Sequence, residues 1–255
     1  MINNSFFSTE ILRWFRENGR DLPWRETRDP YAIWLSEIIL QQTRIVQGWE
    51  YWERFMQTYP KVEDLAAASE DDVLKLWQGL GYYSRARNLH AAAKQIVALG
   101  SFPNTLDGIK SLKGVGDYTA AAIGSFAFDI PAAVVDGNVY RVLSRYFGID
   151  TPINSTQGKK EFAALAQSLL PASDAASYNQ GMMDFGAIQC TPQSPKCLLC
   201  PLAETCEALR CGRVEELPVK NKTVKVKIRH LSYIYIRCRS AVAEGSEITE
   251  PMIAI

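Results

Sequence analysis

Residues 112–120, LKGVGDYTA, join a short segment, TLDGIKS at 105–111, to a longer one, YTAAAIGSFAF at 118–128. The apolar residues of both segments have helical spacing, so the stretch predicts two helices joined by a tight turn. Gly114 and Gly116 allow such a turn, and the first N–H groups of the second helix would be free beside it. The turn is therefore either a corner that needs glycine for close packing, or an anion site at a helix N-terminus.

A carboxylate lies in the middle of residues 33–43, IWLSEIILQQT. In a helix, the neighbours of Glu37 one turn away are Ile33, Trp34, Leu40 and Gln41, so water should be scarce around it. One interpretation places Glu37 at the polar edge of an amphipathic helix, reaching solvent through its flexible stem. In the other, burial raises the pKa of Glu37 and keeps it protonated, as a general acid requires.

A second carboxylate, Asp136, stands in residues 134–141, VVDGNVYR, just before a predicted helix. As a structural residue it would be the N-cap of that helix. As a functional residue it would be an ionised carboxylate near helix N-termini, opposite a protonated Glu37. Two carboxyl groups with opposed pKa shifts suit the hydrolysis of a glycosidic bond.

Four of the six cysteines fall within residues 190–206, CTPQSPKCLLCPLAETC. In a reducing compartment such a group is typical of metal ligands rather than disulfides. Only the central pair has the CxxC spacing of zinc sites, and the wider outer spacings favour a cubane iron–sulfur cluster over zinc, with four unliganded buried thiols as a third alternative. The expected ligands are Cys190, Cys197, Cys200 and Cys206, and Cys211 and Cys238 are spare thiols.

Helix signals cover the chain to about residue 210. Ser8, Asp29 with Pro30, and Ser69 stand where helix N-termini are expected, and Gly100 stands where a C-cap is expected. Later helices are expected at 117–128, 138–147, 156–169 and 175–189. One apolar stripe is predicted for the helix before Gly100, formed by Leu89, Ala92, Ala93, Ile96 and Val97. The body of the chain is therefore predicted to be all-α.

The pattern changes after Leu217 and Pro218. Val224, Val226 and Ile228 alternate with basic residues, as in a strand with one polar face. A single strand cannot satisfy its own backbone hydrogen bonds, so it needs partners that the residues to 255 hardly supply. We expect residues 218–255 to be the start of a second domain that is cut short, giving a short β fragment.

Composition indicates a globular protein, with 47% apolar and 22% charged residues. A net charge of zero gives no overall support to nucleic-acid binding, so such binding must depend on local sites. Residues 79–87, GLGYYSRAR, suit stacking on bases and gripping of phosphates, but also an ordinary helix start. No stretch reaches the roughly 18 apolar residues of a membrane span, so we expect a cytoplasmic protein without membrane contact. We also expect a monomer.

Taken together, these strings resemble the helix-hairpin-helix DNA glycosylases, and within them the MutY-type adenine glycosylases. The resemblance runs from about residue 14 to 218 and includes LPWR at 22–25 and YNQGMMDFG at 178–186. It implies a two-lobed all-α fold with a DNA cleft between the lobes. One lobe, a six-helix barrel carrying the hairpin, would span 20–132. The other, the iron–sulfur lobe, would comprise 1–19 and 133–217, and the tail from 218 would begin a Nudix-like domain, truncated here.

The resemblance also implies roles for individual residues. Glu37 would protonate N7 of a flipped adenine, and Asp136 would stabilise the oxocarbenium sugar. Tyr118 and Asn138 would support the leaving base and water. Other positions would bind substrate: the adenine pocket would be shaped by Trp24, Arg25 and Gln180, and the duplex near an oxidised guanine would be entered by Gln42, Thr43 and Tyr82. A DNA phosphate, with an alkali cation, would be held by the hairpin residues Lys113, Gly114, Val115 and Gly116.

Position 118 separates two branches of this family. The endonuclease III branch has a lysine nucleophile there, and tyrosine cannot form its imine, so we expect a monofunctional glycosylase with little strand-cleaving activity of its own. The resembling enzymes act on double-stranded DNA in which adenine is mispaired with 8-oxoguanine or guanine, and carry a 4Fe-4S cluster. Two other interpretations stay open: a DNA-binding module without chemistry, and a thymine or uracil mismatch glycosylase of the same fold.

Overall fold

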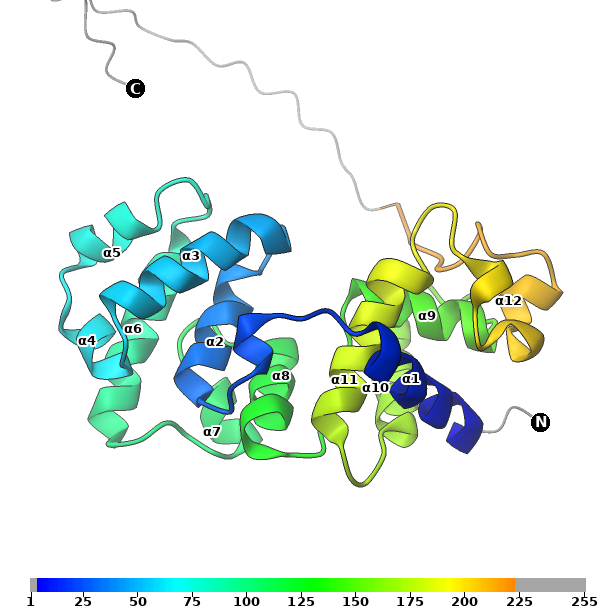
Figure 1. Ribbon diagram of the computed structural model, residues 1–255, viewed down its shortest axis with the longest axis horizontal. Helices are drawn as coiled ribbons and strands as arrows, with labels where there is room; N and C mark the ends of the chain where they lie inside the picture. The colour runs from blue at the N-terminus through cyan, green and yellow to red at the C-terminus, as the bar shows by residue number, and fades with distance from the viewer. Residues whose placement is uncertain (1–3, 223–255) are drawn as a thin grey trace, which may run out of the picture. The chain divides into compact units, whose positions relative to one another are not determined.

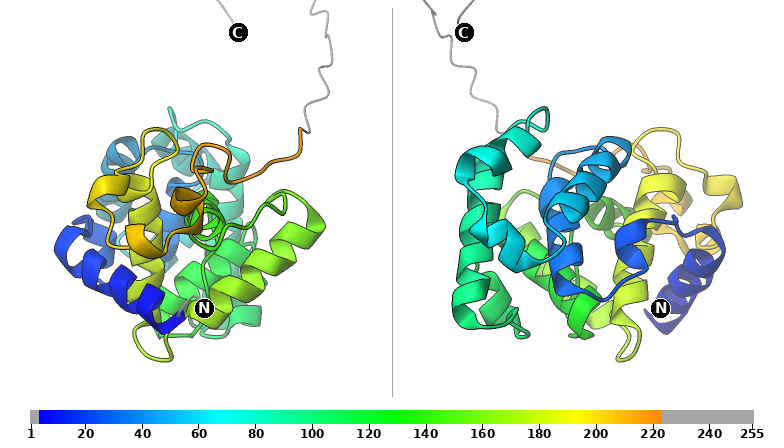
Figure 2. Two further views of the ribbon diagram at one scale, coloured as in Figure 1. Left: turned by 90° about the vertical axis from the view of Figure 1, so that its right-hand side faces the viewer. Right: turned by 60° about the vertical axis from the view of Figure 1, so that its left-hand side comes forward.

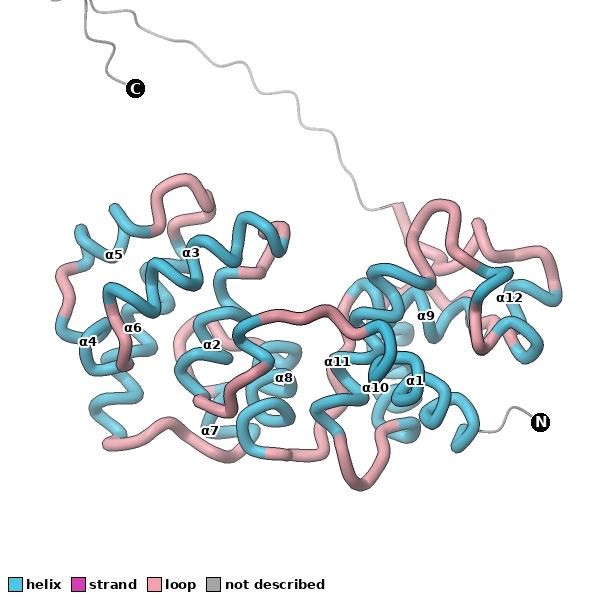
Figure 3. The backbone as a smooth tube through the Cα atoms, viewed as in Figure 1, coloured by secondary structure: helices cyan, strands magenta, loops and turns pink. Residues whose placement is uncertain are grey.

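The computed structural model describes residues 4–222, and these contain helices but no strand (Figure 3). The all-α prediction is therefore confirmed for this part of the chain. The chain divides into two units, Met1–Asn221 and Lys222–Ile255. The strand predicted at 224–229 lies outside the described residues. No helix in the described range is long and apolar enough to cross a membrane.

Two hydrophobic cores organise the first unit, and we call the parts around them the first and second lobes. In Figure 1 the helices of the first lobe gather on the left and those of the second on the right, and the right-hand view of Figure 2 also shows them apart. The first lobe contains α2 (Pro30–Ile39), α3 (Ile45–Thr58), α4 (Val62–Ala67), α5 (Glu70–Leu76), α6 (Ser84–Leu99), α7 (Leu106–Lys110) and α8 (Asp117–Phe128). The second contains α1 (Asn4–Asn18), α9 (Gly137–Phe147), α10 (Thr156–Leu169), α11 (Ala175–Asp184) and α12 (Glu207–Arg210).

The core of the first lobe is rich in aromatic side chains. Trp34 of α2, Phe55 of α3 and Trp77 are fully buried in it. Burying each such side chain contributes roughly 1.5–3 kcal/mol or more to folding. Helix α2 is buried along most of its length, which explains why its sequence is apolar on every face.

The second lobe joins the two ends of the described chain. Phe7 and Ile11 of α1 pack with Phe162 of α10 and with Phe185, which begins a π-helix, Phe185–Gln189, after α11. The sequence pattern predicted one continuous helix over 175–189. The change to π geometry at residue 185 was not visible in the spacing of apolar residues.

Most predicted helix ends are confirmed. Asp29 accepts a hydrogen bond from Tyr31 N at the start of α2, Ser69 accepts one from Asp72 N at the start of α5, and Gly100 ends α6 with a left-handed φ of 80°. The Ser8 cap is wrong, because α1 begins at Asn4 and the Ser8 hydroxyl donates instead to Leu169 O (2.6 Å).

The apolar stripe predicted for α6 includes one residue, Val97, that the structure does not bury. Val97 is 42% exposed, whereas the side chains of Leu89 and Ile96 are buried. Val97 lies at the edge of the helix face that contacts the core, where sequence spacing alone does not separate buried from exposed positions.

Two segments cross between the lobes, residues 19–29 and 129–136 (Figure 1). The buried side chain of Asn179 on α11 fixes the second crossing: its Oδ1 accepts from Val134 N (3.1 Å) and its Nδ2 donates to Ala132 O (2.8 Å). The segment that leads to Asp136 is therefore held against α11 by hydrogen bonds that satisfy buried backbone groups.

Candidate active site

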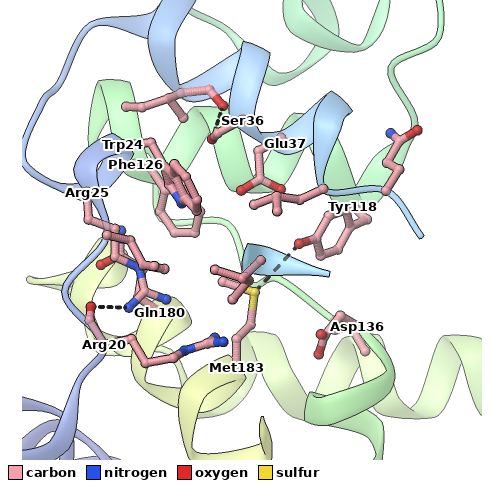
Figure 4. A pocket seen from close by; sticks show the side chains of 16 residues that line it. Arg20, Trp24, Arg25, Ser36, Glu37, Tyr118, Phe126, Asp136, Gln180 and Met183 are labelled. Carbon is pink, nitrogen blue, oxygen red and sulfur yellow. Dashed lines mark hydrogen bonds between the residues drawn. The ribbon is translucent and has the colours of Figure 1, made fainter. Parts of the chain in front are cut away.

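A pocket of ≈ 340 Å³ is lined by residues of both lobes and of the crossing segments (Figure 4). This volume lies in the range of small-molecule sites. It brings together six of the residues singled out from the sequence: Trp24, Arg25, Glu37, Tyr118, Asp136 and Gln180. Glu37 and Asp136, 99 positions apart in the chain, are close enough for the Asp136 charge to raise the pKa of Glu37.

Glu37 projects from α2 into this pocket and is only 8% exposed. Burial raises its pKa from 4.5 to about 7, the Tyr118 hydroxyl and the Arg25 charge act in the opposite direction, and the Asp136 charge raises it further. The interpretation of Glu37 as a solvent-reaching residue on the polar edge of a helix is therefore wrong. The carboxyl group is half protonated near neutral pH, as a general acid requires.

Asp136 is the N-cap of α9 as well as a wall of the pocket. Its Oδ1 accepts from Asn138 N (2.9 Å) and Val139 N (2.8 Å), and its Oδ2 accepts from Asn138 Nδ2 (2.7 Å). Burial raises the pKa of Asp136, while these hydrogen bonds lower it. The prediction of opposed shifts is wrong in direction, because burial outweighs the cap. The two carboxyl groups differ instead in the hydrogen bonds that favour ionisation.

Tyr118, a residue of α8, lies between the carboxyl groups of Glu37 and Asp136. Its hydroxyl donates to Met183 Sδ (3.6 Å) (Figure 4). Burial, with the nearby charges of Glu37 and Asp136, raises the pKa of Tyr118 well above its ordinary value. The phenol therefore remains a neutral hydrogen-bond donor at neutral pH.

A buried ion cluster forms one side of the pocket. Asp184, fully buried at the end of α11, accepts from Arg25 Nη1 (2.8 Å) and Nη2 (2.9 Å) and from Arg20 N and Nε (both 2.8 Å). Arg25 also donates to Arg20 O (3.0 Å). Neither Asp184 nor Arg20 was predicted as a site residue, because the contact between them joins positions 164 apart in the chain.

Four of the predicted catalytic and substrate-binding residues do not line the pocket: Asn138, which donates to Asp136, and the three predicted to enter the duplex. Gln42 and Thr43 lie in the loop after α2, and Tyr82, 67% exposed, lies in the loop before α6. Gln42 (φ 57°) and Tyr82 (φ 46°) both have left-handed backbones, which are costly for residues other than glycine.

The hairpin predicted from LKGVGDYTA joins α7 to α8. Gly114 has a φ of 79°, and a Cβ there would lie 2.8 Å from Asn88 Cβ, so both the backbone conformation and the packing require glycine. Gly116 is the N-cap residue of α8, and space beside it is open. Lys113, Gly114 and Gly116 are exposed, whereas Val115 is buried and anchors the turn. The two interpretations of this turn, packing and anion binding, are therefore compatible.

Cys190, Cys200 and Cys206 pack against the second core, and all four cysteines of residues 190–206 are free thiols. Burial raises the pKa of Cys200 to about 12 and raises those of Cys197 and Cys206, with smaller effects of the neighbouring thiolates. Thiols whose pKa values are raised in this way are stable as thiolates only around a positively charged centre. No group of three or more ligating side chains in residues 4–222 is placed to hold a single metal ion, so the chemistry of the donors, not a tight tetrahedron, supports an iron–sulfur cluster.

Two buried arginines of α9 connect the cysteine segment to the pocket side of the lobe. Arg141 donates to Cys190 O (2.8 Å) and to Asn138 Oδ1 (2.8 Å), and Asn138 in turn donates to Asp136. Arg145 donates to Thr191 O (2.7 Å) and to Pro192 O (3.1 Å). The cysteine segment and the Asp136 cap are thus held by the same helix.

Comparison with known proteins agrees with this geometry. The family model for the iron–sulfur binding domain of endonuclease III matches residues 190–206, which confirms the predicted iron–sulfur site. A protein of Buchnera aphidicola subsp. Acyrthosiphon pisum named adenine DNA glycosylase is 40% identical over 227 residues, covering 87% of this chain and 65% of that protein. A mouse protein of the same name is 42% identical over 226 residues, covering 83% of this chain and 44% of its own length. The chain thus spans less than two thirds of these relatives.

A solved structure, that of a thermostable thymine-DNA glycosylase, superposes with a TM-score of 0.76 at 34% identity, covering 82% of this chain and 97% of that one. This likeness confirms the predicted all-α, two-lobed helix-hairpin-helix fold. The family model described as HhH-GPD superfamily base excision DNA repair protein matches residues 35–171, more than half of the chain. This chain therefore belongs to the HhH-GPD superfamily of base excision DNA repair proteins.

Proposed function

We propose that the protein hydrolyses the N-glycosidic bond of adenine mispaired with 8-oxoguanine or guanine in double-stranded DNA. One observation carries the proposal: a buried carboxyl group with a pKa near 7 shares a pocket with a second, hydrogen-bonded carboxylate. The names of the two relatives support adenine as the base. Because one chain supplies every pocket residue, a monomer suffices.

In the proposed reaction Glu37 donates its proton to N7 of an adenine flipped out of the duplex. Protonation turns adenine into a neutral leaving group, so the C1′–N9 bond breaks with its electron pair passing to the base. The sugar is left as an oxocarbenium ion, and addition of water completes hydrolysis. The raised pKa of Glu37 supports this role because the proton is both present and transferable near neutral pH.

The ionised carboxylate of Asp136 would stabilise the positively charged oxocarbenium ion. Its hydrogen bonds from Asn138 and Val139 hold the carboxylate in one orientation, so little reorganisation is needed as charge develops. Tyr118 would support the leaving base as a neutral donor, and Asn138 the water. The adenine pocket would be shaped by Trp24, Arg25 and Gln180, all of which line it.

Contacts to the duplex would come from loops outside the pocket. We propose that Gln42, Thr43 and Tyr82 enter the duplex near the opposite guanine. The hairpin residues 113–116 would bind a phosphate, with an alkali cation, through the exposed N-terminus of α8. Cys190, Cys197, Cys200 and Cys206 would hold the 4Fe-4S cluster, which when bound supplies a thiolate-ligated core that fixes the segment against α9.

The enzyme would be monofunctional. Tyr118 occupies the position where a lysine nucleophile would form an imine, and its phenol remains protonated. A strand break should therefore appear only after alkali is added.

A single-turnover assay tests the proposal on duplexes with adenine opposite 8-oxoguanine, with and without alkali. We expect alkali-dependent breaks at the adenine for the wild type, and a loss of about 10³-fold or more for Glu37→Gln, which keeps the shape but cannot donate the proton. Binding without cleavage would contradict the proposal and favour the DNA-binding module.

The likeness to a thymine-DNA glycosylase makes thymine the second candidate base. A matched duplex set with thymine or uracil opposite guanine decides between them. Cleavage at thymine but not adenine would replace adenine in this proposal. We expect the opposite, because a general acid aimed at a purine ring nitrogen has no equal use with a pyrimidine.

A further inference from the structure

Arg85 lies at the start of α6, next to the C-terminal end of α2. Its guanidinium is partly buried, it forms no ion pair with any residue in the range 4–222, and its Nε is buried without a hydrogen-bond partner. A cation held in protein without a carboxylate must be stabilised by oriented dipoles. Backbone carbonyl oxygens provide them here.

Those oxygens come from two loops and one helix end. The Nη1 atom faces Ile38 O (3.2 Å), Ile39 O (3.1 Å) and Gln41 O, and Nη2 donates to Leu80 O (3.1 Å). The carbonyls of residues 38 and 39 belong to the last turn of α2, where the helix dipole favours a positive charge. The same turn follows Glu37 directly.

We call residues 40–44 the first rim loop and residues 79–83 the second rim loop. Each contains an exposed residue in a left-handed backbone, Gln42 in the first and Tyr82 in the second. Conformations of this kind persist only where surrounding contacts determine them. Apart from the ring of Trp77, 5.1 Å away, the groups next to the Arg85 guanidinium are those of the α2 end and of the two loops, including the Tyr82 ring at 5.8 Å.

We propose that Arg85 is a positioning residue that joins the two rim loops into one unit, so that Gln42 and Tyr82 are presented to the duplex together and in fixed relation to Glu37. That Gln42 and Tyr82 face a DNA duplex rests on the proposed function. The joining itself rests on the carbonyl contacts alone. Lysine cannot replace arginine in this role, because a single ammonium lacks the planar fork that reaches both loops at once.

Hydrogen exchange of the native wild-type protein tests the joining without any substitution. The amides of Thr43, bonded to Leu40 O (3.2 Å), and of Leu80, bonded to Trp77 O (3.1 Å), report on the first and second rim loops. If Arg85 joins the loops, both amides should exchange through one opening event, with the same dependence on denaturant. Clearly different opening free energies for the two amides would overturn the proposal.

Substitution provides the second test, with Arg87→Lys as the matched control. Arg87 lies two residues away on α6, is 56% exposed and forms an ion pair with exposed Glu70 (3.2 Å). Arg85→Lys should raise exchange in both rim loops and leave the buried amides of α8 and α9 unchanged. Arg87→Lys should raise neither. Faster exchange in one loop only, or throughout the protein, would overturn a joining role.

Excision of adenine separates this proposal from the proposed function. A misplacement of about 1 Å at groups remote from the reacting bond can lower a rate by up to about a hundredfold. We expect the rate of Arg85→Lys to fall by about ten- to a hundredfold with an unchanged pH optimum, and that of Arg13→Lys, at an exposed arginine of α1, to stay within about twofold. An inactive wild type with coupled loops would refute the function and leave the joining intact. An active wild type whose rate is unaffected by Arg85→Lys would refute the positioning role.

Discussion

The two sides of the pocket present a carboxyl group in opposite ways. The first lobe presents Glu37 from the interior of an apolar helix, where neighbouring backbone amides are already used by the helix. The second lobe presents Asp136 from a helix N-terminus, where free amides and the Asn138 side chain donate to it. Burial raises the pKa of both groups, yet the anion of Asp136 is favoured by backbone and side-chain donors at the start of α9, whereas that of Glu37 is favoured by the Tyr118 hydroxyl and the Arg25 charge. The position of a carboxylate in a helix thus selects its chemical role.

The largest expected effect comes from removing the charge of Asp136 while keeping its cap. Asparagine caps helices about as well as aspartate, so Asp136→Asn should change the free energy of unfolding by only about 1–2 kcal/mol. The excision rate should fall by about 10³-fold, because the oxocarbenium ion loses its counter-charge. Chemical denaturation and single-turnover kinetics measure the two effects. A rate close to that of the wild type would show that Asp136 is only a cap.

A smaller effect concerns the stability cost of Glu37. A pKa raised from 4.5 to about 7 means that the unfolded chain releases this proton at lower pH than the folded protein, so stability is lost as pH rises from about 4.5 to 7. Glutamine cannot ionise. The difference in free energy of unfolding between Glu37→Gln and the wild type should therefore shift by about 3 kcal/mol in favour of Glu37→Gln between pH 4.5 and pH 8.

Urea denaturation of both proteins at the two pH values measures this gain. The control is the exposed residue Glu50, for which Glu50→Gln should shift stability by a similar small amount at both pH values. An equal difference between wild type and Glu37→Gln at pH 4.5 and pH 8 would contradict a buried, proton-holding Glu37.

The smallest expected effect is the pH dependence of the wild-type rate. Glu37 must be protonated, so the single-turnover rate should fall above pH 7 and be about tenfold below its plateau at pH 8. Asp136 must be ionised, so the rate should also fall at low pH. Because the pKa of Asp136 is raised, the midpoint of this fall should lie above the ordinary carboxyl value of 3.8. A rate that does not fall between pH 7 and 8 would assign the proton donor to another group.

Much of the site could be predicted because its signals are local. Glu37 was found from four apolar or amide neighbours one helical turn away, and the structure buries it. Asp136 was placed before a helix, and it caps α9. Asp184 and Arg85 were missed for a common reason. Asp184 pairs with arginines more than 150 positions away, and Arg85 bonds carbonyls more than 40 positions away, so no spacing within one element reveals them.

The helices, the hairpin glycines and the four clustered cysteines could be recognised from the order of residues alone, because helix periodicity, caps and left-handed turns depend on residues within a few positions of each other. By contrast, it is the packing of the helices that places Glu37 and Asp136 in one pocket and raises both pKa values by burial. Desolvation is the sum of contributions from every element packed around a group. It is therefore fixed only when helices from both lobes close around the carboxyl groups and exclude water.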